Sequence, residues 1–113
     1  RAAAPNAITI PGADTLTFGG NRVDFRAMVA TCHDGQRVEL TASETKLLKL
    51  LAGHAGTVVA RKMVVEHLFG SSATPTARTL DNVVLRLRKL FEADPGAPRH
   101  LHTVRGIGFR FDP

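Results

Sequence analysis

Basic, amide and hydroxyl side chains recur at helical spacing in the segment around residue 80. They are Arg78, Thr79, Asn82, Arg86 and Lys89. At roughly 100° per residue, these positions fall on one side of a helix. A guanidinium group binds guanine O6 and N7 or a phosphate, an Asn amide pairs with adenine, and a Thr methyl group contacts thymine. The pattern is typical of a helix that reads the major groove of duplex DNA, although a solvated polar face is the simpler alternative.

A second candidate group lies near the C-terminus, in a glycine-rich turn. The residues His100 to Val104 and Phe109 to Asp112 are predicted strands, and Arg105-Gly106-Ile107-Gly108 joins them. Glycine lets the backbone approach a partner closely, and an arginine at such a tip can enter a narrow minor groove. The alternative is an ordinary hairpin turn with an exposed arginine. The turn is no dinucleotide-binding motif, because a third glycine and a following helix are missing.

The first group needs a packed helix behind it, and the sequence predicts one over about Thr76 to Ala93. Apolar side chains in this segment form a stripe about 120° wide that must face a core. The stripe consists of Leu80, Val83, Val84, Leu87, Leu90 and Phe91. We therefore expect a helix with one buried face and one polar face.

Two further helices and a sheet are predicted before it. Thr41-Ala42-Ser43-Glu44 has the pattern of a capping box, and leucines at helical spacing follow as far as Gly53 or Gly56. A second helix is expected over Arg61 to Phe69, with Met63, Val64 and Leu68 pointing inward and Gly70 ending it. Thr57-Val58-Val59 is expected to be a short β-like link.

Short β-type runs occupy Leu16 to Leu40 and are broken by glycine turns. The clearest is Asp34-Gly35, between Met28–His33 and Gln36–Leu40, which favours a hairpin with a two-residue turn of positive φ. A small antiparallel sheet is therefore expected at the start of the domain.

Other chemistries find little support in the sequence. The lone Cys32 excludes an intrachain disulfide, and we expect it to pack as a small apolar side chain, which fits a reducing cytoplasmic compartment. His100 and His102 would share a strand face without a third metal ligand, whereas His33, His54 and His67 are expected at the surface. We expect no metal, no cofactor and no enzymatic activity, and no apolar run is long enough to span a membrane.

The composition fits one small domain with an acidic partner. The 113 residues include 15 Lys and Arg against 10 Asp and Glu, for a formal net charge of +5, and 43% are hydrophobic. That length buries a core without disulfides, and the positive charge favours a polyanion. Residues 1–14, rich in Ala and Pro, are expected to be a linker tail, and residues 15–113 the domain. Since the chain lacks an initiator Met, we expect it to come from a longer protein.

Three motifs in this order resemble the OmpR/PhoB family of winged-helix effector domains, over about Leu16 to Asp112. They are Leu40-Thr41-Ala42-Ser43-Glu44, the helix segment Arg78-Thr79-Leu80-Asp81 through Arg86-Leu87-Arg88-Lys89, and Thr103-Val104-Arg105-Gly106-Ile107-Gly108-Phe109-Arg110-Phe111. The resemblance implies an α+β fold, a winged helix-turn-helix with an N-terminal four-stranded antiparallel sheet, three helices and a C-terminal β-hairpin wing. It also implies sequence-specific binding of double-stranded DNA by the output half of a two-component response regulator.

The resemblance assigns roles to particular residues. It implies that Arg78, Thr79, Asn82 and Arg86 face the major groove, that Arg88 contacts the DNA backbone, and that Thr103 and Arg105 belong to the wing. The loop Gly70 to Thr76 matches the segment that often meets RNA polymerase in this family. We expect a dimer on DNA and a monomer when the domain is isolated.

The chain departs from the family pattern at a few positions. Leu85 stands where a basic residue is usual and lies on the polar side of the predicted helix, so it contacts either thymine methyl groups or a second protomer. Ala60 replaces the usual hydroxyl cap of the second helix. An adaptor that docks a protein on the same helix face is the competing function. Substituting Arg86 by Ala is expected to weaken DNA binding and leave the fold intact.

Overall fold

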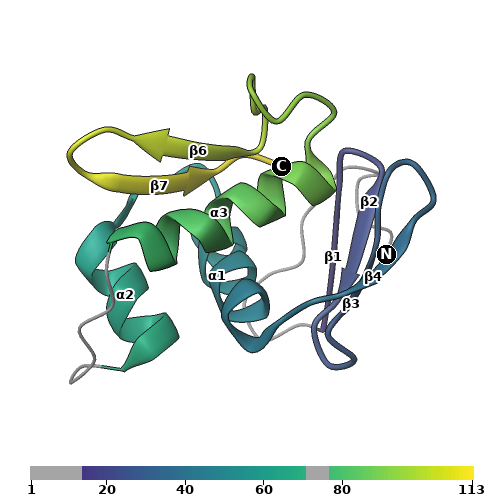
Figure 1. Cartoon of the computed structure of the whole chain (residues 1–113), viewed down its shortest axis with the longest axis horizontal. Helices are drawn as coiled ribbons and strands as arrows, with labels where there is room; N and C mark the ends of the chain where they lie inside the picture. Colours follow the sequence, from purple (N-terminus) through teal and green to yellow (C-terminus); the bar gives the residue numbers. More distant parts are fainter. Residues whose placement is uncertain (1–13, 71–76) are drawn as a thin grey trace.

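Four short strands precede the first helix in the computed structural model, which describes residues 14–70 and 77–113 (Figure 1). They are β1 (Thr15–Phe18), β2 (Asn21–Asp24), β3 (Val29–Thr31) and β4 (Arg37–Glu39). Each strand pairs antiparallel with the next, in the order β1-β2-β3-β4. The predicted four-stranded antiparallel sheet is confirmed. Of the expected linker tail, residues 1–13 lie outside the described residues.

The turn between β3 and β4 differs from the expected two-residue turn. Thr31 pairs with Arg37, and the N–H of Cys32 donates to the carbonyl of Gln36 at 2.8 Å, which leaves three residues in the turn. Gly35 has φ +89° while Asp34 stays at negative φ. A three-residue turn with glycine in the left-handed region is as compatible with the twist of the two strands as a two-residue turn. The Asp-Gly pair therefore predicts the position of the turn correctly but not its length.

Helix α1 (Ala42–Gly53) begins at the capping box that the sequence predicts. The Thr41 hydroxyl accepts a hydrogen bond from the N–H of Glu44, and the Glu44 carboxylate accepts one from the N–H of Thr41. The helix ends at Gly53, the first of the two predicted stops, with His54 as its C-cap.

Helix α2 (Arg61–Phe69) has the predicted bounds, but one of its three inward residues is wrong. Val64 and Leu68, four residues apart, are buried, whereas Met63 is 50% exposed. Met63 lies about 100° from Val64 around the helix, outside the stripe that the buried pair defines. Ala60 makes no side-chain cap, as predicted, and the N–H of Arg61 instead donates to the carbonyl of Ile107 at 3.1 Å.

The predicted C-terminal hairpin is present and extends into a small second sheet. Strands β6 (Leu101–Val104) and β7 (Gly108–Phe111) pair antiparallel, and the short link β5 (Val59–Ala60) pairs with the other edge of β7. A Cβ on Gly108 would overlap the carbonyl of Val59. The close approach of β5 and β7 therefore requires glycine at that position.

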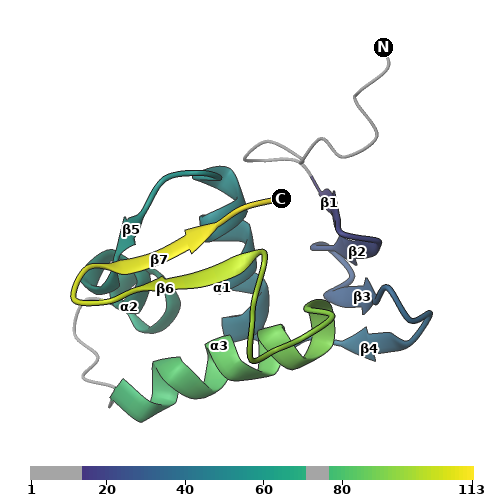
Figure 2. The same ribbon diagram turned by 90° about the horizontal axis from the view of Figure 1, so that it is seen from above.

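Helix α3 (Ala77–Phe91) lies across one side of the domain, with the hairpin alongside it and the four-stranded sheet beyond its C-terminal end (Figures 1 and 2). The three parts meet at Phe18, whose ring packs edge-on against Phe91, His100 and Phe111 at centroid distances of 5.0–5.4 Å. The buried Asn21 adds a polar tie from β2, because its amide donates to the carbonyl of Phe91 at 3.0 Å. The sheet, helix and hairpin thus share one core.

None of the helices in the described ranges is long and apolar enough to cross a bilayer.

Candidate nucleic-acid interface

The amphipathic pattern of α3 determines which side of the helix is exposed to solvent. Its buried side chains are Leu80, Val84, Leu87 and Phe91, with Val83 and Leu90 half-buried beside them. The helix ends at Phe91, two residues before the predicted end. Of the predicted start, Thr76 lies outside the described residues.

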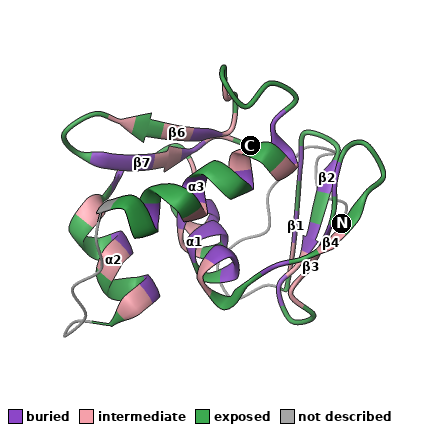
Figure 3. Cartoon of the chain, in the orientation of Figure 1, coloured by how far each residue is buried: buried purple, intermediate pink, exposed green. Residues whose placement is uncertain are grey.

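The opposite face of α3 is exposed and polar (Figure 3). The exposed side chains on it are Arg78, Thr79, Asn82, Leu85, Arg86 and Lys89. Leu85 is 50% exposed in the middle of this group, which we call the outer face of α3. The structure thus brings the five residues of the predicted polar stripe together, with one apolar side chain among them.

Arg86 on the outer face is also tied to α1. Its Nη1 donates to both oxygens of the Glu44 carboxylate at 2.8 Å, and the Glu44 side chain is only 5% exposed. The Arg86 side chain remains 44% exposed. One end of the guanidinium is therefore held by a buried carboxylate while the rest faces solvent.

Arg88 points away from the outer face and toward the hairpin. Its Nε donates to the carbonyl of Leu101 at 2.9 Å, and its Nη2 donates to the Thr103 hydroxyl at 2.7 Å. Burial lowers the pKa of the Arg88 guanidinium, while the negative charges of Glu92 and Asp81 act in the opposite direction. Arg88 and Thr103, two predicted site residues, therefore contact each other.

The tip of the hairpin presents Arg105 to solvent. Val104 pairs with Gly108, and the N–H of Ile107 donates to the carbonyl of Val104 at 3.0 Å, closing a tight turn. Gly106 has φ +77°, a conformation that glycine adopts without strain. Ile107, at 59% exposure, stands beside Arg105 at the tip.

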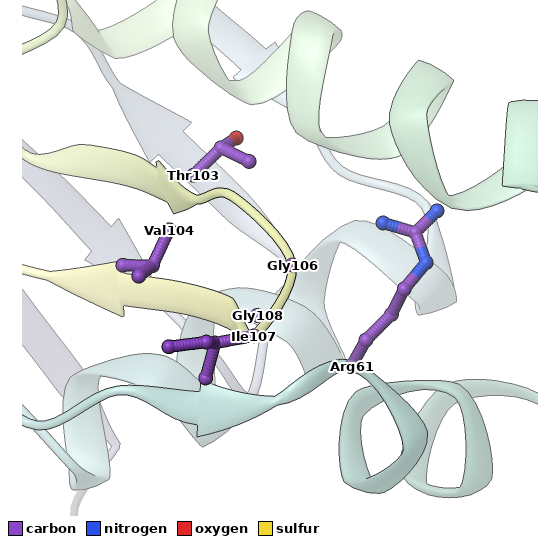
Figure 4. A pocket seen from close by; sticks show the side chains of 6 residues that line it. All are labelled: Arg61, Thr103, Val104, Gly106, Ile107 and Gly108. Atoms are coloured by element: carbon purple, nitrogen blue, oxygen red, sulfur yellow. The ribbon is translucent and has the colours of Figure 1, made fainter.

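A small hollow of about 170 Å³ lies between this tip and the start of α2 (Figure 4). The side chain of Arg61 extends past Gly106 toward α3, and Thr103 projects toward the same helix. Arg61 Nη2 donates to Asp81 on α3 at 3.3 Å. The hollow is thus lined by the start of α2 and by the β6–β7 hairpin.

Of the residues considered for other chemistries, His100 and His102 have backbone partners. Cys32 is buried, as expected, and its neighbour His33 is exposed. His100 Nδ1 lies 2.8 Å from the carbonyl of Asp112, and His102 Nε2 lies 3.0 Å from the carbonyl of Arg99. In the part of the chain that the structure describes, no three His, Cys, Asp or Glu side chains gather as a metal site would require.

Sequence reasoning missed four residues that hold the interface in place. They are Glu44, Arg61, Asp81 and Glu92. Glu44 was visible only as the end of a capping box, and nothing local indicates that it binds Arg86, 42 residues later. Asp81 and Glu92 lie eleven residues apart, a spacing that places them on one side of a helix. This spacing is a weak indication that they act on the same neighbouring element.

Known proteins are similar to this chain in sequence. Residues 35–111 match the family described as "Transcriptional regulatory protein, C terminal". PetR of Rhodobacter capsulatus is 39% identical over 114 aligned positions, which cover 96% of this chain and 47% of that protein, so the chain spans about half the length of this relative.

Two solved structures are similar in fold and sequence. DrrB, an OmpR/PhoB homologue from Thermotoga maritima, has a TM-score of 0.76 and 31% identity, covering 88% of this chain and 45% of its own. The DNA-binding domain of RstA from Klebsiella pneumoniae, solved in complex with the RstA box, has a TM-score of 0.71 and 29% identity, covering 89% of this chain and 99% of its own. With its sheet, three helices and winged hairpin, this chain belongs to the OmpR/PhoB family of C-terminal transcriptional regulatory domains.

Proposed function

We propose that this domain binds double-stranded DNA in a sequence-specific manner and acts as the effector part of a transcriptional regulator. One observation carries the proposal: the outer face of α3 exposes base-reading and cationic side chains beside a hairpin tip that exposes Arg105. A helix has the width of the major groove, and a hairpin next to it reaches the adjoining minor groove. The similar RstA domain was solved in complex with its DNA box, which supports the same partner here.

Each site residue has a part in this proposal. Arg78, Thr79 and Asn82 read base edges from the first turns of α3, and Lys89 binds a phosphate. Arg86 reads a base or a phosphate with the end of its guanidinium that Glu44 leaves free. Because the buried carboxylate holds the other end, this arginine loses little side-chain freedom when it binds.

The hairpin completes the interface. Arg105 enters the minor groove, where a narrow A·T-rich stretch has an enhanced negative potential. Thr103 and Arg88 lie at the side of the hairpin that faces α3 and bond to each other, so they support the wing from inside the interface. The formal charge of +5 adds a long-range attraction to DNA.

The proposal also covers the longer protein to which the domain would belong. We propose that the domain is the output half of a two-component response regulator, that it binds DNA as a dimer, and that it acts in the cytoplasm. Contact with RNA polymerase is assigned to the loop Gly70 to Thr76; all of that loop except Gly70 lies outside the described residues.

Salt dependence tests DNA binding against the competing adaptor function. Labelled duplex of random sequence is titrated with the domain at two salt concentrations, followed by selection of the preferred site from a random pool. Binding through about four phosphates gives a log–log slope near −3.6, since each contact contributes about −0.9. A domain that leaves duplex unbound even at low salt would contradict the proposal and favour a protein partner for the outer face.

A further inference from the structure

A second polar stripe, separate from the outer face, runs along α3 and ends one residue past the helix, at Glu92. Asp81, Arg88 and Glu92 are spaced by seven and four residues, which puts them within about 40° of each other around the helix. This stripe lies between the buried side chains and the outer face. Its three members all have partners in or next to the hairpin, so we call it the wing-facing stripe.

Glu92 holds the base of the hairpin. Its carboxylate accepts hydrogen bonds from the backbone N–H groups of Arg99, His100 and Leu101 at 2.8–2.9 Å, and the residue is only 3% exposed. Three charge-assisted bonds to consecutive amides fix where strand β6 starts relative to α3.

Arg88 holds the middle of β6. The Nε bond to the Leu101 carbonyl and the Nη2 bond to the Thr103 hydroxyl contact two residues on the same side of that strand. Two donors on one planar group fix both the distance and the tilt of the strand. An ammonium group has one nitrogen and cannot occupy both acceptors in the same way.

Asp81 acts near the tip through Arg61. The Arg61 guanidinium donates to Asp81 at 3.3 Å and lies over the ring of Phe109 on β7 at 5.7 Å. The backbone N–H of Arg61 donates to the carbonyl of Ile107. Arg61 and Asp81 are about half exposed, so this tie is weaker than the other two. The hairpin is nonetheless held to α3 at its base, its middle and its tip.

We infer that Arg88 is a positioning residue that fixes the wing at one distance from α3, so that the domain reads the major groove and the adjoining minor groove as a single site. The inference rests on the proposed DNA-binding function. Two recognition elements joined by a loose connection would each keep their own preference, whereas a rigid connection penalises any site in which only one half fits.

The alternative for Arg88 is a direct phosphate contact, and the two roles respond differently to substitution. A phosphate contact needs charge, so Arg88→Lys retains it and Arg88→Gln loses it. A positioning role needs the planar pair of donors, so both variants lose it. Lys89→Gln is the matched control, since it removes one exposed charge from the next position without changing a contact to the hairpin.

The experiment measures affinity for two versions of the selected site, with A·T or G·C pairs under the wing. We expect the parent to prefer the A·T version about tenfold, equivalent to about 1.4 kcal/mol. Arg88→Lys and Arg88→Gln should reduce that ratio to about twofold or less while the salt slope changes little. Lys89→Gln should lower affinity for both versions equally and keep the ratio.

A second pair of variants covers the case in which substitution of Arg88 disturbs folding. Thr103 is exposed, so Thr103→Val should fold normally, and because it removes the hydroxyl acceptor it should lose the flank preference. Thr103→Ser keeps the hydroxyl and should retain the preference. Amide hydrogen exchange in β6 should accelerate in Arg88→Lys and Thr103→Val and stay unchanged in Thr103→Ser.

Three results would overturn the inference. One is that Arg88→Lys keeps the full preference for the A·T version, while the salt slope of Arg88→Gln is smaller in magnitude by about 0.9. That pair of results would identify a phosphate contact. Another is a parent that binds its site tightly with no preference for either flank. A parent that fails to bind duplex at low salt removes the proposed function itself, and this result is distinct because no variant is needed to observe it.

Discussion

The Arg86 guanidinium on the outer face of α3 binds both oxygens of the Glu44 carboxylate at 2.8 Å, although the two residues are 42 positions apart in the chain. Glu44 is also the third residue of α1 and accepts the N–H of Thr41 in the capping box. One buried carboxylate therefore links the start of α1 to the middle of α3. A residue that sequence patterns assign to DNA recognition is at the same time part of the fold.

Substituting Arg86 by Ala should lower the free energy of unfolding by about 1–3 kcal/mol, because the buried Glu44 carboxylate loses its two charge-assisted bonds. The loss stays below that of a fully buried pair, since Arg86 is 44% exposed. Urea denaturation measures this loss of stability. The sequence alone predicts that Arg86→Ala leaves the fold intact, and the bond to Glu44 changes that prediction.

Arg78→Ala is the matched control for that experiment. Arg78 is exposed on the same face of α3, and its substitution should change the free energy of unfolding by less than about 0.5 kcal/mol. Equal stability of the two variants and the parent would show that the Glu44–Arg86 pair does not stabilise the fold in solution.

Gly108→Ala should destabilise the domain by about 2 kcal/mol or more, because the added Cβ overlaps the Val59 carbonyl where β5 and β7 meet. Thermal unfolding is the measurement. Gly96→Ala provides the comparison: the nearest atom to its added Cβ is Asp94 Oδ1 at 3.4 Å, an ordinary contact. A Gly108→Ala variant as stable as Gly96→Ala would contradict the close approach of the two strands.

The Cys32 thiol should make stability fall at alkaline pH. Burial raises the pKa of this thiol above its ordinary 9.0, and the Asp34 carboxylate acts in the same direction. The pKa of the thiol is higher in the folded chain than in the unfolded chain. Its contribution to the free energy of unfolding is therefore present below pH 9.0 and is lost as the pH rises toward the folded-state pKa.

Urea denaturation of the parent and Cys32→Ala between pH 7 and 10.5 isolates that thiol. The stability difference between the two proteins should be constant up to about pH 8.5 and then narrow. A difference that stays constant over the whole range would mean that the thiol titrates alike in the folded and unfolded chain.

Leu85 should read a thymine methyl group. It is half exposed in the middle of a face whose other members include Arg78 and Lys89, and cations around an apolar side chain favour DNA over a second protein surface. Removing one methyl contact costs about 0.8 kcal/mol, or fourfold in affinity. Replacing the contacted thymine by deoxyuridine should therefore weaken the parent about fourfold.

The same DNA change should have no effect on Leu85→Ala, which already lacks the contact. Anisotropy titrations of both proteins on both duplexes form a complete cycle. If deoxyuridine weakens both proteins equally at every thymine of the site, Leu85 does not contact a methyl group, and a second protomer becomes its partner.

The sequence predicts those parts of the fold that depend on local patterns. The bounds of α2, the capping box of α1 and the buried stripe of α3 follow from the spacing of a few residues each. Local patterns were less reliable where several solutions satisfy the same rule. The three-residue turn at Gly35 and the exposed Met63 are such cases, because turn length and the edge of a helix stripe are set by packing partners.

The candidate site was predicted as a set of exposed residues but not as an arrangement. The outer face of α3 follows from helical periodicity alone. The contacts of Arg86 with Glu44 and of Arg88 with β6 join segments 42 and 13–15 residues apart, and no local spacing encodes such pairs. The sequence therefore indicates which residues are available to a partner, and tertiary packing decides which of them are already engaged.

Amide chemical shifts of the ¹⁵N-labelled domain, followed as the selected duplex is added, locate the surface that binds DNA. We expect the largest changes along the outer face of α3 and at Arg105 to Ile107, with the exposed strand positions Arg22 and Arg37 of the four-stranded sheet almost unchanged. Changes confined to that sheet, or none at excess duplex, would contradict DNA recognition by α3 and the wing.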